Sequence, residues 1–310
     1  MNALVTGASG FAGRYLVAEL RREGYDVLAC GGPADGEFFP LDLLDASTIR
    51  AALDVSAPQF VFHLAAQTFV PDALASPMST YMTNVRGTVN VLEAVRGFGL
   101  ACGHTPRVVF VSSAEVYGRQ PPDASPLREI TPLSPANPYA ASKAAGEMIV
   151  LGEARSFGID VVIARAFNHI GPGQDERFAV ANFARQLAAI AAGAQPVMLV
   201  GNLDARRDFC DVRDIVRAYA MLAKDGVQGE TYNVCSGIAR SIRDVLRELI
   251  IVAHVPVEVR EDPDRMRPSD VPFFVGDNAK LRAATSWEPS IPFQRSIRDI
   301  YEAARKMSAS

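Results

Sequence analysis

Short apolar runs alternate with amphipathic, helix-like segments through the first half of the chain. The strand-like runs occupy residues 3–6, 27–30, 60–64, 108–111 and 161–164. Between them, apolar residues recur at helical spacing, most clearly over 11–23, 80–96 and 137–157. Strands that alternate with helices predict a parallel sheet with helices on both faces. Right-handed crossovers then bring the carboxyl ends of the strands to one edge, where ligands bind.

After about residue 166 the expected elements become shorter and more mixed. The pattern predicts helices over 178–192, 211–223 and 242–253, and strands over 197–200, 231–234 and 257–260. A proline-rich loop over 263–272 and a final helix follow. We expect an α/β fold with a Rossmann-type doubly wound parallel sheet over 1–166, with contributions from about 205–235. A smaller mixed α/β part over 167–310 is expected to bind substrate.

The overall composition excludes several classes of protein. With 310 residues, 49% hydrophobic and 21% charged, the chain suits one large or two fused globular domains. A net charge of −4 offers no basic surface for nucleic acid. The longest uncharged run, 187–203, contains glycine and proline, so no membrane span is expected. The four cysteines lack metal-ligand spacing, and no basic leader precedes the first strand, which predicts a cytoplasmic protein with reduced thiols and no metal.

A glycine-rich segment follows the first predicted strand. Gly7, Gly10 and Gly13 stand between this strand and the start of a helix, which is the context that a phosphate-binding loop requires. Glycines there let the backbone approach a pyrophosphate, and the helix N-terminus adds amide donors and the positive end of its dipole. The segment therefore predicts a dinucleotide-binding loop.

Three polar residues downstream indicate redox chemistry at the same sheet edge. Ser113 follows the strand over 108–111, and Tyr139 and Lys143 form a Tyr-x-x-x-Lys pair on one face of the helix over 137–157. An ammonium near a phenol favours the phenolate, so we expect Lys143 to lower the pKa of Tyr139. Such a tyrosine exchanges a proton with a carbinol oxygen while a cofactor carries the hydride.

Together these motifs resemble those of the extended short-chain dehydrogenases/reductases, over essentially the whole chain. The resemblance rests on the glycine segment, His63-Leu64-Ala65-Ala66, Asn84-Val85-Arg86-Gly87-Thr88, Ser112-Ser113 and Tyr139-x-x-x-Lys143. Within that family, the run 201–209, Arg267-Pro268-Ser269-Asp270 and Trp287-Glu288-Pro289 resemble the GDP-mannose 4,6-dehydratase group. The run 167–174 is most similar to GDP-6-deoxy-4-keto-mannose reductases, which make GDP-D-rhamnose.

The resemblance implies a role for each matching residue. Ser113 would hydrogen-bond the sugar C4 oxygen, Tyr139 would supply the proton, and Lys143 would hold the nicotinamide ribose. The cofactor would contact Gly7, Gly10, Phe11, Ala12, Gly13, Arg14, Asp42, Leu43, Leu64, Ala65, Ala66, Tyr139 and Lys143. Arginine suits a diphosphate because its guanidinium pairs with phosphate oxygens at two points. The sugar nucleotide would be bound by Ser113, Glu115, Asn168, Arg185, Asn202, Arg207 and Arg267.

Structural roles also fit some of the polar residues near these motifs. His63 ends a predicted buried strand, so we expect a hydrogen-bonded core histidine rather than a catalyst. Asn84 is expected to tie backbone segments together, and His169 to pack beside the site. Arg185 lies on a predicted helix, where it would either reach the nucleotide base or face water.

The residues after Ser113 separate three related reactions. The resemblance implies that 4,6-dehydratases place a polar pair there for elimination, whereas this chain has Ala114, which cannot transfer a proton, before Glu115. Epimerase-reductases that make GDP-fucose use a cysteine and a histidine where this chain has Glu115 and Gly173. Reduction of a C4 ketone needs only a hydride, the tyrosine proton and the serine hydrogen bond. We therefore favour NAD(P)H-dependent reduction of the C4 ketone of a GDP-4-keto-6-deoxy-hexose, or of a closely related heptose.

Three alternatives stay open: a GDP-mannose 4,6-dehydratase-like enzyme, a nucleotide-sugar epimerase, and a non-enzymatic NADP-sensing protein on the same fold. The choice of cofactor is weakly encoded, because neither an acid nor an arginine directly follows the second strand. Asp35 would favour NADH, whereas Arg14 would meet the 2′-phosphate of NADPH, and we lean towards NADPH.

The helices over 80–96 and 137–157 carry more apolar residues than one sheet face needs. In the family that the chain resembles, these two helices pair across a two-fold axis. The resemblance therefore implies a homodimer through a four-helix bundle, and a pathway role in supplying a deoxysugar for surface polysaccharide.

Overall fold

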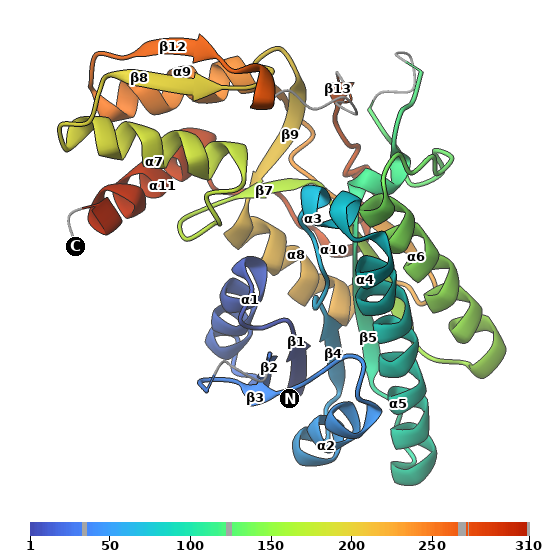
Figure 1. Ribbon diagram of the computed structural model, residues 1–310. Helices are drawn as coiled ribbons and strands as arrows, with labels where there is room; N and C mark the ends of the chain where they lie inside the picture. Colours follow the sequence, from blue (N-terminus) through green and yellow to red (C-terminus); the bar gives the residue numbers. More distant parts are fainter. Residues whose placement is uncertain (33–35, 122–125, 266–270, 272, 309–310) are drawn as a thin grey trace.

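A seven-stranded parallel sheet forms the centre of the computed structural model, which describes residues 1–32, 36–121, 126–265, 271 and 273–308 (Figure 1). The strand order is β10-β6-β5-β4-β1-β2-β3, and every neighbouring pair is parallel. The chain thus starts in the middle of the sheet, builds outwards to β3, and then crosses back to β4. The predicted Rossmann-type doubly wound fold is confirmed, and its reversal point lies between β1 and β4.

The strands of this structure are β1 Asn2–Thr6, β2 Asp26–Gly31, β3 Phe39–Pro40, β4 Phe60–His63, β5 Arg107–Ser113, β6 Val161–Ala166, β7 Asn168–Ile170, β8 Val197–Val200, β9 Arg206–Asp211, β10 Thr231–Val234, β11 Ala239–Ser241, β12 Glu258–Glu261 and β13 Phe273–Phe274. The helices are α1 Phe11–Arg22, α2 Ala46–Ser56, α3 Val70–Ala75, α4 Pro77–Tyr81, α5 Gly87–Cys102, α6 Pro138–Phe157, α7 Ala179–Ala191, α8 Val212–Asp225, α9 Ile242–Ala253, α10 Ala279–Thr285 and α11 Phe293–Ser308. Short helical turns cover Met82–Arg86 (π), Ala114–Tyr117 and Pro263–Arg265 (both 3-10).

Each face of the main sheet buries its own apolar core. On one face, Leu16 and Leu20 of α1 pack with Ile215 and Val216 of α8 against the sheet. On the other face, the apolar sides of α2, α5 and α6 form a second core. Central strands are apolar on both sides for this reason, and β6 is buried along its whole length.

The long helix expected over 80–96 is divided. The segment begins as α4, passes through the π-helical turn Met82–Arg86, and continues as α5 to Cys102. The turn places Asn84 inward, where its amide accepts from the Gln67 amide and donates to the Gln67 carbonyl and to Ser142 Oγ, at 2.8–2.9 Å. The prediction that Asn84 ties backbone together is confirmed, and the tie accounts for the local change of helix type.

The C-terminal half builds a smaller mixed part around a third apolar core, formed mainly by α7, α9 and α11 (Figure 1). Its strands form a four-stranded sheet of β7, β9, β11 and β13 and a two-stranded sheet of β8 and β12. In contrast, α8 and β10 join the main sheet. The division at residue 166 stays a prediction, and most of the expected loop over 263–272 lies outside the described residues.

Within the described ranges, none of the helices combines the length and apolar character needed to cross a bilayer. The same ranges hold no group of three His, Cys, Asp or Glu side chains suited to a metal ion.

Candidate active site

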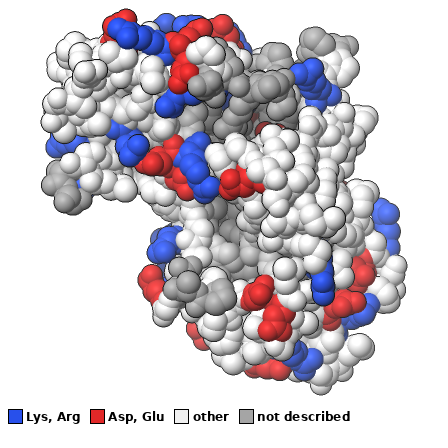
Figure 2. All heavy atoms as spheres, viewed as in Figure 1, with Lys and Arg blue, Asp and Glu red and all other residues white. Residues whose placement is uncertain are grey.

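A cleft of about 520 Å³ opens at the carboxyl ends of β1, β4, β5 and β6. Figure 2 shows the surface hollowed between the part of the molecule that holds α7 and β8 and the part that holds α1 and β1. The predicted glycine segment and the predicted catalytic residues all line this cleft. The predicted site residues that line it are Gly7, Gly10, Phe11, Ala12, Gly13, Leu64, Ala65, Ala66, Ser113, Glu115, Tyr139, Lys143 and Asn168.

The glycine segment has a geometry that side chains would prevent. Gly7 has φ +70°, and a Cβ there would lie 2.8 Å from the backbone of Ala65. At Gly13 a Cβ would lie 2.1 Å from the Gly7 carbonyl oxygen, so α1 can pack this closely on the loop only without a side chain. Gly10 is the N-cap of α1 and has no side chain to cap the first turn. The amides of that turn therefore suit the pyrophosphate of a dinucleotide.

Ser113, Tyr139 and Lys143 converge from two elements. Ser113 is the last residue of β5, and Tyr139 and Lys143 lie one turn apart at the start of α6, where Asn137 caps the helix by accepting from the Ala140 amide. The Ser113 hydroxyl lies near enough to the Tyr139 phenol to lower its pKa. Lys143 Nζ donates to the carbonyl oxygen of Val111 at 2.9 Å. This grouping brings a phenol, a hydroxyl and an ammonium together at one sheet edge.

The expectation that Lys143 lowers the pKa of Tyr139 is wrong for this structure. Burial raises the pKa of Tyr139 to about 12, although the nearby Ser113 hydroxyl lowers it, and the charge of Glu115 adds to the rise. Burial also lowers the pKa of Lys143 to about 8, while the charge of Glu147 opposes that change. The desolvation of Tyr139 outweighs the stabilisation of a phenolate that the four-residue spacing from Lys143 predicts. Tyr139 is therefore a protonated phenol near neutral pH.

Ala114 and Glu115 form the turn that follows Ser113. Ala114 is buried, and the Glu115 amide donates to Ser113 Oγ at 3.2 Å. The Glu115 carboxylate lies 3.5 Å from Asn137 Nδ2. Glu115 therefore lies among the cleft residues beside the predicted proton donor, while the position before it offers no polar side chain.

His169 lines the cleft and also packs. Its ring stacks on Phe11 with centroids 5.9 Å apart, and its Nδ1 lies 3.1 Å from the Phe167 carbonyl oxygen. Burial lowers the pKa of His169, so the ring is neutral near neutral pH. His169 therefore both packs and faces the site, which are the two roles that the sequence suggested for it.

His63 is a satisfied core residue, as predicted. Its Nδ1 lies 2.9 Å from Thr6 Oγ1 and its Nε2 lies 3.1 Å from Thr88 Oγ1. Because the Thr88 hydroxyl donates to the Asn84 carbonyl, we assign the ring proton to Nε2. Burial, followed by the charge of Lys143, lowers the pKa of His63 to about 3, so it is neutral at working pH.

Other predicted ligands lie outside the lining of the cleft as the described residues define it. Arg185 pairs with Glu176 at 2.6 Å on an exposed surface, Arg207 donates to the carbonyls of Arg206 and Val271, and Asn202 accepts from the Asp204 amide. Arg14 donates to the Ser9 carbonyl and lies over the Phe38 ring. Asp42 and Leu43 lie beyond β3, where Asp42 accepts from the Leu44 amide. Arg267 and Asp35 fall outside the described residues.

Several lining residues were missed by sequence reasoning. They are Thr68, Phe69, Val70, Gln174, Phe178, Tyr219 and Phe274. Phe69 and Phe178 meet edge to face, 5.8 Å apart, across the two parts of the chain. Their pairing depends on contacts distant in sequence, and no local spacing signals it.

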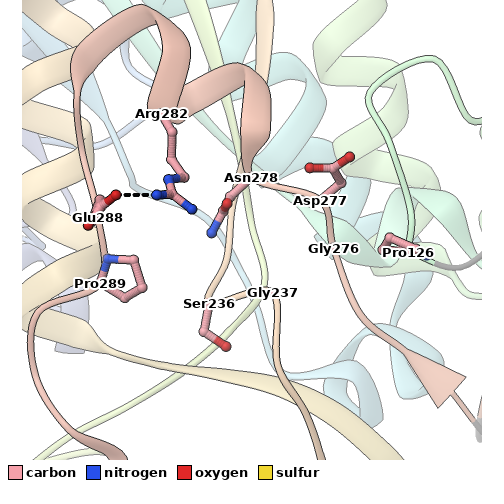
Figure 3. Close-up of a pocket in the computed structure, with 9 residues that line it drawn as sticks. All are labelled: Pro126, Ser236, Gly237, Gly276, Asp277, Asn278, Arg282, Glu288 and Pro289. Carbon is pink, nitrogen blue, oxygen red and sulfur yellow. Dashed lines mark hydrogen bonds and ion pairs between the residues drawn. The ribbon is translucent and has the colours of Figure 1, made fainter.

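A second hollow lies outside this cleft, around Ser236, Asn278 and Arg282 (Figure 3). Its polar side chains already have partners: Arg282 pairs with Glu288, Asn278 donates to the Cys235 carbonyl, and Ser236 donates to Asp208. We therefore assign the chemistry to the cleft.

Comparisons with known proteins agree with this geometry. Residues 30–300 match the family model described as GDP-mannose 4,6 dehydratase. The chain is 39% identical to GDP-6-deoxy-D-mannose reductase of Pseudomonas aeruginosa, over 96% of this chain and 94% of that protein. It is 33% identical to GDP-6-deoxy-D-talose 4-dehydrogenase of Aggregatibacter actinomycetemcomitans, over 91% and 90%. The solved structure of RMD from Pseudomonas aeruginosa complexed with NADPH has a TM-score of 0.89 and 36% identity, covering 99% of this chain and all of that one. The chain therefore belongs to the GDP-mannose 4,6 dehydratase family of the extended short-chain dehydrogenases/reductases.

Proposed function

We propose that this protein is a nucleotide-sugar 4-ketoreductase that uses NADPH or NADH to reduce the C4 ketone of a GDP-4-keto-6-deoxy-hexose. The observation that carries the proposal is the convergence of Ser113, Tyr139 and Lys143 beside the glycine segment in one cleft. A reductase of a GDP-6-deoxy sugar and a 4-dehydrogenase of another are among its relatives, which supports the substrate class.

The residues of the cleft divide the work of ketone reduction. Bound NADPH or NADH supplies the hydride that reaches C4. Tyr139 gives its phenolic proton to the C4 oxygen, so that hydride and proton together convert the ketone to an alcohol. Ser113 hydrogen-bonds the same oxygen and holds it beside Tyr139. The Lys143 ammonium would bind the nicotinamide ribose, and Tyr139 would take a new proton from solvent after each turnover.

The ionisation state of Tyr139 suits a proton donor. A phenol with a pKa of about 12 carries its proton throughout the neutral range. It therefore has a proton to donate when a ketone binds.

Elimination is less well supported than reduction at this site. A 4,6-dehydratase needs an acid and a base beside the sugar, and the buried methyl group of Ala114 occupies one of the two positions. The chain has Glu115 and Gly173 where the epimerase-reductases have their cysteine and histidine. A dehydratase remains the second candidate, because Glu115 stays beside the proton donor.

The proposal includes NADPH as the preferred cofactor, supported by the exposed Arg14 side chain next to the glycine segment. It keeps Asn168, Arg207 and Arg267 as ligands of the GDP diphosphate, and Arg185 and Asn202 as further substrate contacts. It also includes a cytoplasmic location, which the four unpaired cysteines support. Finally, it includes a homodimer in which α5 and α6 form a four-helix bundle; sedimentation equilibrium of the purified protein tests this assembly.

The deciding experiment supplies GDP-4-keto-6-deoxy-mannose, freshly made from GDP-mannose by a dehydratase, and follows NADPH absorbance. Oxidation of NADPH matched by a new GDP-6-deoxy-hexose is the expected result, and NMR of the product then assigns its C4 configuration. If NADPH is not oxidised and the protein instead converts GDP-mannose to a 4-keto sugar, it is a dehydratase.

A further inference from the structure

A buried ion pair lies beneath the three predicted catalytic residues. Glu147 of α6 is fully buried and Arg165 of β6 is 5% exposed. Arg165 Nη2 donates to Glu147 Oε2 at 2.7 Å, and Arg165 Nε donates to Glu147 Oε1 at 2.9 Å. Burial opposes ionisation of the guanidinium, but the hydrogen bond and charge of Glu147 raise the pKa of Arg165, so the pair is ionic. Such a two-point pair fixes direction as well as charge.

The same carboxylate is tied to the strand that carries Ser113. Ser112 Oγ donates to Glu147 Oε1 at 2.5 Å. Two consecutive residues of β5 are therefore hydrogen-bonded to α6: Val111 to Lys143, and Ser112 to Glu147. Tyr139, Lys143 and Glu147 follow one another at four-residue steps, and the last two fasten this face of α6 to the end of β5 at two successive turns.

Arg165 is itself held from the far side. Its Nη1 donates to Tyr117 Oη at 2.9 Å and to the Glu129 carbonyl at 3.1 Å. Tyr117 Oη then donates to Asn233 Oδ1 at 2.7 Å. The carboxylate of Glu147 is thus the point where strand, helix and this polar network meet.

The charges around Lys143 come from four elements. On α6, Tyr139 is a neutral phenol and Glu147 is the anion one turn further on. On β4, His63 is neutral, and on β6, Arg165 carries the opposing positive charge. Glu115, in the turn after β5, acts on Tyr139. Glu147 is therefore the anion on the helix of Lys143 that offsets part of the cost of burying its ammonium.

We propose that Glu147 is a positioning residue for the proposed reduction, holding α6 in register against the end of β5 and balancing the charge of the Lys143 ammonium. The inference rests on the proposed function for its catalytic consequence. The register of α6 and the charge balance at Lys143 are properties of the protein itself, and the charge balance can be tested without substrate or cofactor.

Titration of Lys143 by NMR tests the electrostatic part without substrate or cofactor. The sequence holds four lysines, Lys143, Lys224, Lys280 and Lys306, so a protein labelled at the lysine ε-carbons gives few signals, and Lys143→Met assigns the one of interest. In Glu147→Gln we expect Lys143 to lose its proton at lower pH than in the wild type, because the anion is gone and Arg165 is left unpaired. In the double variant Glu147→Gln/Arg165→Met both charges are absent, and the titration returns towards that of the wild type.

Kinetics test the catalytic part. At pH 8 we expect kcat/KM of Glu147→Gln to fall about tenfold and the alkaline limb of its pH profile to move to lower pH, with partial recovery in the double variant. Glu147→Asp keeps the charge but shortens the side chain, so it should titrate like the wild type and still lose kcat through the shifted register. Asp214→Asn removes another buried carboxylate, which pairs with Arg217 away from the cleft, and should leave the Lys143 titration unchanged.

Each outcome decides between roles. An unchanged Lys143 titration in Glu147→Gln overturns the charge-balancing role. Full kcat in Glu147→Asp overturns the role of Glu147 in holding the register of α6. The same conservative variant keeps this role testable if Glu147→Gln does not fold. If the wild type reduces no GDP-4-keto sugar, the proposed function fails, while the NMR titration still decides the role of Glu147.

Discussion

Replacing Tyr139 with phenylalanine removes the proposed proton donor and leaves its ring in place. The residue is 9% exposed, and phenylalanine fills nearly the same volume, so the core beneath it stays packed. The substitution removes a buried phenolic hydroxyl, which costs about 1 kcal/mol of folding free energy. A loss of that size leaves the variant folded, so a change in rate can be read as a change in chemistry.

The expected loss in kcat/KM is about 1,000-fold, which corresponds to about 4 kcal/mol of transition-state stabilisation. The substrate ketone would still meet Ser113 and the bound cofactor, but its oxygen would have to take a proton from water. Affinity for NADPH, measured by its fluorescence, should change little, because Lys143 and the glycine segment remain. Rates are measured by stopped-flow absorbance of NADPH with GDP-4-keto-6-deoxy-mannose.

Tyr232→Phe is the matched control. It removes another buried phenol hydroxyl, which accepts from the Val227 amide at 3.0 Å and lies outside the cleft lining. We expect it to lose stability and to keep kcat/KM within about threefold, or about 0.7 kcal/mol. If Tyr139→Phe retains more than about a tenth of the wild-type kcat/KM with normal NADPH affinity, Tyr139 is not the proton donor and the mechanism is refuted.

Three further predictions follow from the same structure. In the wild type, kcat/KM should fall as pH rises through about 8, because Lys143 loses its charge there whereas Tyr139 keeps its proton to about 12; a profile that stays flat to pH 9.5 would contradict this. Gly13→Ala places a Cβ 2.1 Å from a carbonyl oxygen of the glycine segment. It should lower the free energy of unfolding, measured with denaturant, by about 1–3 kcal/mol and weaken NADPH binding. Gly152→Ala, where a Cβ on α6 would have open space, should do neither. Arg14→Ala should reduce the ratio of NADPH to NADH affinity in fluorescence titrations, and an unchanged ratio would mean that another group selects the cofactor.

The main sheet was predictable because its signals are local. Strands such as β10 and helices such as α9 were placed to the residue, since apolar periodicity is strong where one face or both faces are buried. The helix α2 was missed although its signals are present: Asp45 caps it by accepting from the Ser47 amide, and Ile49, Ala52 and Leu53 are buried at helical spacing. The π-helical turn at Met82–Arg86 was not predictable, because it depends on Asn84 meeting Gln67 and Ser142 in space.

The residues of the candidate site also divide into those that local sequence signals predict and those that depend on tertiary contacts. Residues fixed by a motif, such as Gly7, Ser113 and Tyr139, line the cleft as expected. The arginines are different, because a long side chain finds its partner only in the folded chain: Arg185 pairs with Glu176, and Arg207 donates to two carbonyl groups. The predicted roles, a diphosphate for Arg207 and the nucleotide base or water for Arg185, therefore stay predictions.

The pKa of Tyr139 shows why spacing alone misleads about charge. Four-residue spacing correctly places Tyr139 and Lys143 on one face of α6, but the shift in pKa depends on what covers that face. Burial there opposes ionisation of both groups, and it raises the pKa of Tyr139 and lowers that of Lys143. The same four-residue step continues to Glu147, so the sequence already contained the anion that counters this cost for the ammonium. The sequence pattern did not show that Arg165, which lies on β6, pairs with this anion. The ionisation of the site is therefore a property of tertiary pairing, and substitutions at Glu147 and Arg165 should alter the pH dependence of the reaction although neither residue touches the substrate.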